Sequence, residues 1–415
     1  MRARLVVFAR GKLLCVDSGE DLTRAQKYAV LSHRLVLDTT GTCHIMFPDN
    51  PFTEVEREQE QIAKHMCVCM SIGGGYETIR GSTPSEPILS EAASLVMRDK
   101  SFKLADALAD VLNHHNINPG DRAELIISAF FTWARDKVVS ATPCAASCGQ
   151  LSRYFSVTEL FKFFFSKSTF TSMSASFPSL RGTNATEQTF DQMFEGTSMH
   201  FTHFIKLQAR ELLAQAYLPL FMACGAAVLC ASCQCGVDAI YLYLYSGSHL
   251  RSNNVGFIMV RVIRGVSLKS QDEIFKNMDP FKCRLLQDSH CVDGNLTIPI
   301  IRIVFELCHG ESVPLGMIQK TYTSPSLGSS SLDDGGQSKF TSYDFWCSGV
   351  DLDVIEPVKE GPETWRALVK RADPWKVFYN DALDGNMLCS QFPACGNQLP
   401  HFDTWAAQIP GLQFD

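Results

Sequence analysis

Two apolar runs, CGVDAIYLYLY (235–245) and VGFIMVRVI (255–263), form the central pattern of this 415-residue chain. Each run has the length and the β-branched and aromatic content of a buried strand. The turn-rich segment GSHLRSNN (247–254) joins them. Asp238 opens the first strand, and the second strand carries Arg261 and Ile263. Because side chains alternate along a strand, Arg261 and Ile263 share one face of the predicted sheet.

The flanking sequence extends this pattern from about residue 199 onward. It predicts a helix, three strands, a second helix and a fourth strand, at 201–225, 226–231, 237–246, 255–264, 270–281 and 298–307. The last strand, IPIIRIVFEL, is apolar along nearly its whole length, as expected when both faces of a sheet are covered. This αβββαβ order predicts an α/β fold, α+β overall, with a restriction-endonuclease-like, or PD-(D/E)XK, core.

The rest of the chain divides by composition into further regions. Apolar residues at spacings of three and four predict helices at 88–100, 102–117 and 120–141. Short strand-like runs such as RLVVFAR (4–10) indicate a small mixed region before them. We therefore expect five parts: a mixed region 1–87, a helical domain 88–167, a linker 168–198, the core 199–350 and a C-terminal extension 351–415.

Charge and hydropathy narrow the classes of protein to which the chain can belong. A net charge of -7 and a pI near 5.9 argue against a non-specific nucleic-acid coat, although a local basic groove is compatible with both values. The apolar run at the amino terminus is too short for a secretory signal, so we expect an intracellular protein, cytoplasmic or nuclear. Residues 212–237 carry no charge, but Pro219, Gly225 and Gln234 interrupt them, which favours a buried helix and strand over a membrane span. The sixteen cysteines are then expected to be small buried hydrophobes.

Residues 203–263 resemble a group of uncharacterised fungal, mainly basidiomycete, proteins. Those proteins carry a run of the kind RGAAILCANNQRGVDIIIP…NVTAILIQVKN, which corresponds here to CGAAVLCASCQCGVDAI…NVGFIMVRVI. The likeness continues in FKNMDPF, IPIIRIVFEL and FTSYDFWCSGV, and it covers most of residues 88–350. The group resembles the nuclease-like cores of Crinkler-type effectors. The resemblance implies cleavage of DNA with Mg²⁺ or Mn²⁺, or a vestige of that activity.

The resemblance assigns roles to individual positions. The motif Gln-x-Gly-Val-Asp falls on Gln234 to Asp238, which makes Asp238 the implied metal ligand. Glu211, on the predicted preceding helix, is a candidate for a second carboxylate. The Gln-Val-Lys of the group falls on Arg261, Val262 and Ile263, so the glutamine and the catalytic lysine are both replaced.

These replacements decide the expected chemistry. Ile263 cannot donate a hydrogen bond to a phosphate oxygen, and Arg261 places a permanent positive charge where a metal ligand is needed. We therefore expect a nuclease-like core without normal nuclease chemistry that retains nucleic-acid binding. Lys276, on the helix after the third strand, is the candidate for a relocated catalytic cation. Arg261, Arg264, Lys269, Lys276 and Lys206 would form the rim of a DNA-binding groove.

Several alternatives stay open at this point. Asp238 can be a strand-opening turn residue, and Glu211 can be part of a surface ion pair. A zinc site would use Cys230, Cys233 and Cys235, but no second pair of ligands follows at a useful spacing. Neither GxSxG nor GxGxxG occurs, which argues against a serine hydrolase and a dinucleotide fold. The strongest alternative of another class is a non-catalytic scaffold that docks a protein partner through the helices of residues 88–140.

Overall fold

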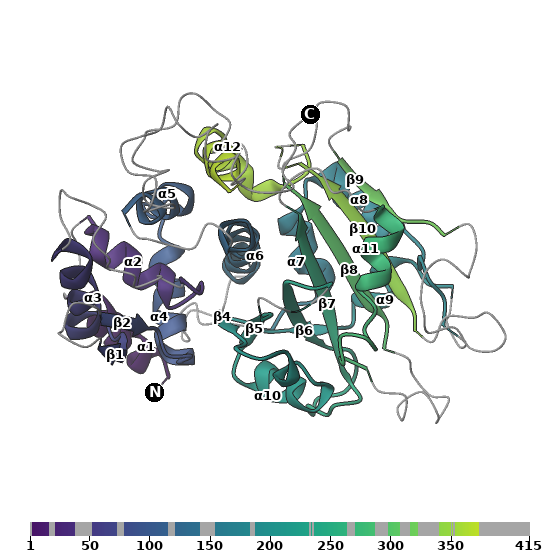
Figure 1. Ribbon diagram of the computed structural model, residues 1–415. Coiled ribbons are helices and arrows are strands. Elements are labelled where there is room, and N and C mark those ends of the chain that lie inside the picture. The colour runs from purple at the N-terminus through teal and green to yellow at the C-terminus, as the bar shows by residue number, and fades with distance from the viewer. Residues whose placement is uncertain are drawn as a thin grey trace, which may run out of the picture.

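The structure is a computed structural model with a mixed α/β architecture, in which helices of the amino-terminal part lie beside a large mixed sheet (Figure 1). It describes residues 2–15, 21–37, 52–72, 79–114, 121–141, 154–182, 187–231, 234, 236–263, 270–286, 298–307, 316–322, 340–349, 351 and 353–372. Residues 73–78 and 323–339, the cysteines 233 and 235, and the basic residues 264 and 269 lie outside these ranges.

The described part of the sheet has eight strands, in the order β4-β5-β6-β7-β8-β10-β9, with β3 paired to β6. Their bounds are β3 Ser198–Met199, β4 His203–Lys206, β5 Ala226–Leu229, β6 Ala239–Leu244, β7 Val255–Ile263, β8 Ile300–Glu306, β9 Gly316–Gln319 and β10 Ser342–Ser348. Strands β5, β6 and β7 form an antiparallel meander, and β8 is parallel to β7. Helix α11 (Gln271–Asn277) lies in the crossover between β7 and β8. The strands after residue 226 therefore follow the predicted order.

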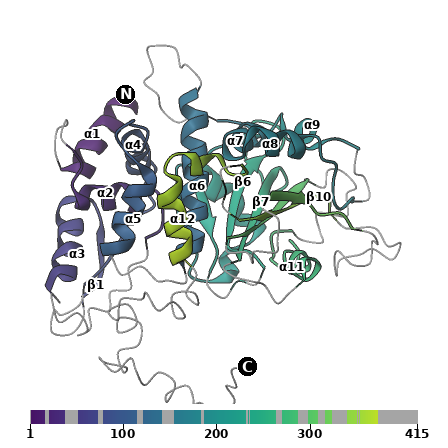
Figure 2. The same cartoon turned by 90° about the horizontal axis from the view of Figure 1, so that it is seen from above.

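Helices cover both faces of this sheet (Figure 2). Helices α6 (Arg122–Ala141), α7 (Val157–Phe164) and α9 (Phe190–Phe194) share a hydrophobic cluster with one face. Helices α10 (Leu218–Ala223) and α11 share a second cluster with the other face. Every residue of β5, β6, β8 and β10 is buried, as expected for strands that are covered on both faces.

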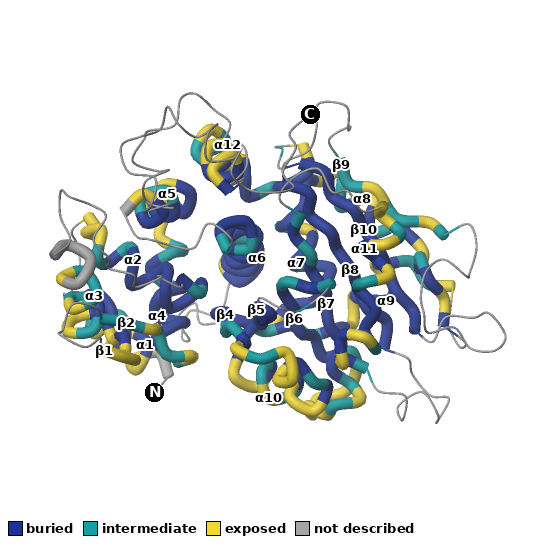
Figure 3. Tube along the Cα trace, viewed as in Figure 1, coloured by how far each residue is buried: buried dark blue, intermediate teal, exposed yellow. Residues whose placement is uncertain are grey.

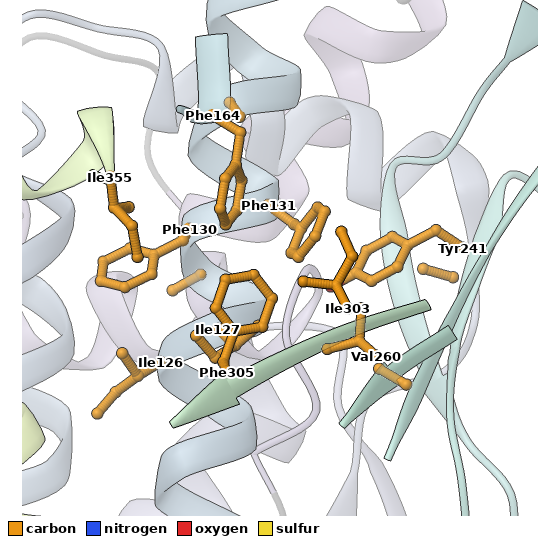
Figure 4. Packing of buried hydrophobic residues seen from close by; sticks show 14 of the residues in the cluster. Ile126, Ile127, Phe130, Phe131, Phe164, Tyr241, Val260, Ile303, Phe305 and Ile355 are labelled. Carbon is orange, nitrogen blue, oxygen red and sulfur yellow. The ribbon is translucent and has the colours of Figure 1, made fainter. Parts of the chain in front are cut away.

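Helix α6 occupies the centre of the molecule (Figure 3). Phe130 and Phe131 are fully buried, and the ring of Phe131 stacks on that of Tyr241 in β6 with 4.1 Å between centroids (Figure 4). Phe131 also contacts Phe164 of α7 and Phe305 of β8. Because neighbours surround most of α6, this helix leaves little surface for a protein partner. The proposed docking of a partner on residues 88–140 therefore has no support from α6.

The amino-terminal part is helical, with one two-stranded hairpin. It contains α1 Arg2–Leu14, α2 Arg24–Ser32, α3 Phe52–Lys64, β1 Val68–Ile72, β2 Ile79–Ser82, α4 Pro87–Met97 and α5 Leu104–His114. The prediction of strands in residues 1–50 is wrong for the described residues. Val6, Ala9 and Leu13 recur at helical spacing and are buried, which favours a helix packed on α4 over two short strands.

A buried ionic network joins this helical part to the sheet. Arg34, just after α2, makes a bidentate ion pair with Asp136 of α6, at 2.8 and 3.0 Å, and its Nε donates to the carbonyl of Thr202. Arg135 donates to the same carboxylate at 2.7 Å and to Glu91 of α4 at 3.3 Å. Bidentate, charge-assisted contacts of this kind fix geometry more strongly than surface pairs do.

Two other predicted elements are wrong. The helix expected at 201–225 is strand β4, then two 3-10 turns, Arg210–Leu212 and Gln215–Tyr217, and then the six-residue helix α10, which has Pro219 in its first turn. The expected linker instead contains α8 (Lys167–Ser174), α9 and β3, and Phe190 and Phe194 of α9 are fully buried. Aromatic residues spaced through a Ser/Thr-rich segment here pack into the core.

The other predicted helices are confirmed. Helices α4, α5 and α6 occupy the three periodic segments, and α7 begins after the N-cap Ser156, whose Oγ accepts from the backbone of Glu159. Beyond residue 350 the described chain ends with α12, Pro362–Arg371. Within the residues that the structure describes, no helix combines the length and the apolar character that a membrane span requires.

Candidate functional site

The candidate site lies at the edge of the sheet where β6 begins and β7 and β8 end. Asp238 is positioned there by its backbone, since its N–H donates to the carbonyl of Val260 at 2.9 Å and its carbonyl accepts from Cys230 at 2.8 Å. Asp238 therefore sits between β5 and β7, one residue before β6. Asp238 and Arg261 form an ion pair at this edge.

Both oxygens of the Asp238 carboxylate accept a hydrogen bond from β7. Nη1 of Arg261 donates to Oδ1 at 2.5 Å, and the backbone N–H of Val262 donates to Oδ2 at 2.6 Å. The side chain of Asp238 is 11% exposed and that of Arg261 is 36% exposed. The oxygens that a divalent cation would need as ligands are thus directed at a guanidinium and an amide.

The loop before Asp238 fits closely against α11. Gly236 has φ +85°, and a Cβ at this position would lie 2.0 Å from the carbonyl oxygen of Asn277. The next motif position, Asn254, forms the turn between β6 and β7: its amide donates to the carbonyls of Ser246 and His249. These two motif positions therefore have clear structural roles, independent of any chemistry.

Gln234 lies in the same loop, where its N–H donates to the carbonyl of Ala231. Its side-chain Oε1 is buried and has no hydrogen-bond partner among the described residues. The residues on either side, 233 and 235, fall outside the described part of the chain. The loop before Asp238 therefore contains a buried acceptor, Oε1 of Gln234, that no described residue satisfies.

Glu306 is a site residue that the sequence analysis missed. In the parallel register of β7 and β8, Ile263 is opposite Glu306, so Glu306 lies beside the position at which the resemblance implies a lysine. Glu306 is 8% exposed, and its Oε2 accepts from Nε1 of Trp346 at 3.1 Å. The sequence does contain one indication of a functional residue here, because Glu306 is the single acid in the apolar run IPIIRIVFEL.

Glu124, in the first turn of α6, is a second missed carboxylate. Burial raises the pKa of the Cys230 thiol well above its usual value, and the charges of Asp238 and Glu124 raise it further. Both carboxylates therefore lie within electrostatic reach of Cys230. An acid in the first turn of a long helix is ordinarily explained by the helix dipole, so its position near the site could not be inferred from its spacing.

Glu211 is not part of the site. It lies in a 3-10 turn, its side chain is 58% exposed, and it pairs with the adjacent Arg210. A backbone hydrogen bond and Arg210 lower the pKa of Glu211. The expectation that Glu211 serves as a metal ligand on a helix is therefore wrong, and the surface ion pair is its role.

The basic residues proposed for the rim are partly neutralised. Lys206, at the end of β4, donates to Asp121 at 2.9 Å, and Arg261 is held by Asp238. Lys276 is exposed in the last turn of α11, whose carboxyl end packs on the Gly236 loop. Among the described members of the predicted rim, two of the three positive charges are therefore paired with carboxylates.

The donor set does not fit a divalent cation. Within the described ranges, no group of three or more His, Cys, Asp or Glu side chains is arranged to hold a metal ion. Asp238 is engaged by Arg261, and Ile263 supplies no polar atom. For a zinc site, Cys230 is buried with a strongly raised pKa, which disfavours the thiolate that zinc requires.

Comparison of the chain with family models, with curated proteins and with solved structures gave no match.

Proposed function

We propose that this chain is a nuclease-like protein of the PD-(D/E)XK type that has lost phosphodiester cleavage and retains nucleic-acid binding. The meander β5-β6-β7, followed by a helical crossover to the parallel strand β8, supports the fold assignment. The observation that carries the loss of catalysis is the ion pair between Asp238 and Arg261. An arginine of the chain occupies the place in which an active enzyme would hold a metal ion.

The ion pair and the isoleucine at 263 each remove one contribution to catalysis. A divalent ion near the guanidinium would be repelled, and it would have to compete with Arg261 for the Asp238 oxygens. The apolar side chain of Ile263 can neither neutralise a scissile phosphate nor orient a water molecule. Loss of a metal ion and of a cation should together reduce the rate of cleavage by ~10³-fold or more.

Arg261 also supports the binding part of the proposal. A guanidinium has five N–H donors, and the contact to Asp238 is made through Nη1. Because the Arg261 side chain is 36% exposed, it can donate to a phosphate oxygen while it remains paired with Asp238. The exposed Lys276 adds a positive charge on the adjacent helix.

A cleavage assay on single- and double-stranded DNA with Mg²⁺ or Mn²⁺ tests the loss of catalysis. We expect no cleavage by the natural protein and Mg²⁺-dependent cleavage by the variant Arg261→Gln plus Ile263→Lys. In that variant Asp238 is released, and the new lysine lies opposite Glu306. Adding Asp238→Ala to the restored variant should abolish its cleavage.

Cleavage by the natural protein that disappears in Asp238→Ala would contradict the proposal and would indicate a rebuilt site. Lys276→Met would then show whether the exposed lysine of α11 supplies the relocated cation. The binding part is measured separately, as the affinity of the natural protein and of Arg261→Gln for the same DNA. If neither binds DNA at low salt, nucleic-acid binding is excluded and the protein-scaffold alternative replaces it.

A further inference from the structure

Arg122, the first residue of α6, is a buried cation without a described counterion. Its side chain is 9% exposed, and none of the hydrogen bonds or ion pairs among the described residues involves it. Its Nε is buried without a hydrogen-bond partner. Buried arginines in proteins are normally paired, as Arg34, Arg135 and Arg302 are in this structure. Among the buried arginines that the structure describes, Arg122 is therefore the exception.

A second arginine lies close to the first. Burial lowers the pKa of Arg122, and the positive charge of Arg371 lowers it further, with no described carboxylate acting in the opposite direction. Arg371 ends α12, is exposed, and donates through Nη1 to the side chain of Asn113 near the end of α5. Helix α12 contacts both α5 and α6, and the end of α12 lies beside the end of α5 and the beginning of α6 (Figure 2).

The beginning of α6 adds a favourable field for an anion. The helix has 20 residues, and the unpaired backbone N–H groups of its first turn carry a partial positive charge. Two carboxylates also lie at this end: Asp121 is paired with Lys206 at 2.9 Å, and Glu124, in the first turn, acts electrostatically on Cys230. The buried, unpaired Arg122 at this same helix end is the independent observation that distinguishes it from an ordinary helix terminus.

We propose that Arg122, Arg371 and the amino-terminal end of α6 form a binding site for a phosphate group. Two guanidinium groups and a helix terminus favour a multiply charged oxyanion, which accepts several charge-assisted hydrogen bonds at once. The phosphate can belong to a small molecule or to a nucleic-acid backbone, because the recognising chemistry is the same. The site does not involve Asp238 or Arg261, so it stands or falls independently of the function proposed above.

The test measures thermal unfolding and calorimetric binding of the whole chain with inorganic phosphate, at constant ionic strength set with chloride. We expect a saturable rise in the melting temperature with phosphate. Arg122→Met, which keeps the length and the apolar stem of the side chain, should weaken phosphate binding at least ~10-fold. Without phosphate, this variant should melt at the same temperature as the natural protein or higher, because a buried unpaired charge has been removed.

Arg371→Gln and Arg366→Gln form the matched pair. Both arginines are exposed on α12, but Arg366 lies five residues before Arg371 and pairs with Glu363. Arg371→Gln should weaken phosphate binding, and Arg366→Gln should leave it unchanged. The Arg371 variant also keeps the proposal testable if Arg122→Met fails to fold.

A second arm replaces inorganic phosphate with a short single-stranded DNA at the same phosphate concentration. A response to either ligand that depends on Arg122 and Arg371 supports the site, and the stronger of the two identifies the source of the phosphate. The proposal is overturned if neither ligand raises the melting temperature. It is also overturned if Arg122→Met lowers the melting temperature without phosphate while the phosphate response persists.

Discussion

At Gly236 a single hydrogen atom in place of a side chain lets the loop before Asp238 pack on α11. The residue has φ +85°, and a Cβ would meet the carbonyl oxygen of Asn277 at 2.0 Å. Gly236→Ala therefore adds a strained backbone and a clash with main-chain atoms that cannot rotate away. We expect the free energy of unfolding to fall by about 2–4 kcal/mol, measured by urea denaturation.

Gly196→Ala is the control for this substitution. Nothing lies within 4 Å of a Cβ at Gly196, and its φ is outside the left-handed region. Its free energy of unfolding should change by less than about 1 kcal/mol. Equal effects of the two alanines would show that the close approach of Gly236 to α11 is not a feature of the folded protein.

Among the residues of the candidate site, Asp238, Arg261 and Ile263 could be predicted from the sequence. Alternation along a strand placed Arg261 and Ile263 on one face, and the acid opening the preceding strand was Asp238. Glu306 and Glu124 could not be found in this way. Their proximity depends on the register of β8 against β7 and on the packing of α6, which are long-range contacts that local patterns do not encode.

Most of the longer helices and strands were predicted well. Helices α4, α5 and α6 and strands β6, β7 and β8 fall in the expected segments. The segment 201–225 was misjudged because apolar residues at helical spacing also suit a short parallel strand. His203–Lys206 pairs with β5, a partner that lies more than twenty residues away. Tertiary pairing here overrides local propensity.

Strand β4 also carries a group that links stability to pH. His203 is 2% exposed; its Nε2 lies 2.6 Å from Oγ of Ser85 and its Nδ1 lies 2.9 Å from Oγ1 of Thr202. Burial, followed by the charges of Arg34 and His33, lowers the pKa of His203 to about 4. The unfolded chain, with a histidine pKa near ~6.5, binds more protons than the folded protein between these two values.

The contribution of His203 to the free energy of unfolding should therefore be fully present above pH ~6.5. It should decrease by ~3 kcal/mol as the pH falls toward 4. His203→Gln should flatten this part of the profile in urea denaturation between pH 4 and 7. His249→Gln, at an exposed turn position, should leave the profile unchanged. A natural protein whose stability does not change over this range would contradict a buried, neutral His203.

At the scale of the whole molecule, one hydrophobic cluster joins regions that composition had separated. It runs from Leu31 and Leu35 of the α2 region through α5 and α6 to the faces of β6, β7 and β8. The buried pair Arg34–Asp136 reinforces this junction, and Arg34 also bonds the backbone just before β4. Composition marked boundaries near residues 88 and 168, but burial connects the described residues across both of them.

This continuity predicts that the helical part and the sheet unfold together. Leu31→Ala, at a fully buried position on α2, should cost about 2–5 kcal/mol by leaving a cavity. We expect a single transition, shifted to lower urea by the same amount for tryptophan fluorescence and for far-ultraviolet circular dichroism. Leu5→Ala, at a position on α1 that is 43% exposed, is the matched control and should shift the transition little.

Two separate transitions, with only the first moved by Leu31→Ala, would mean that the helical part unfolds independently of the sheet. The contacts of α6 argue against that outcome, because Phe131 packs on β6 and β8 while Asp136, on the same helix, holds Arg34.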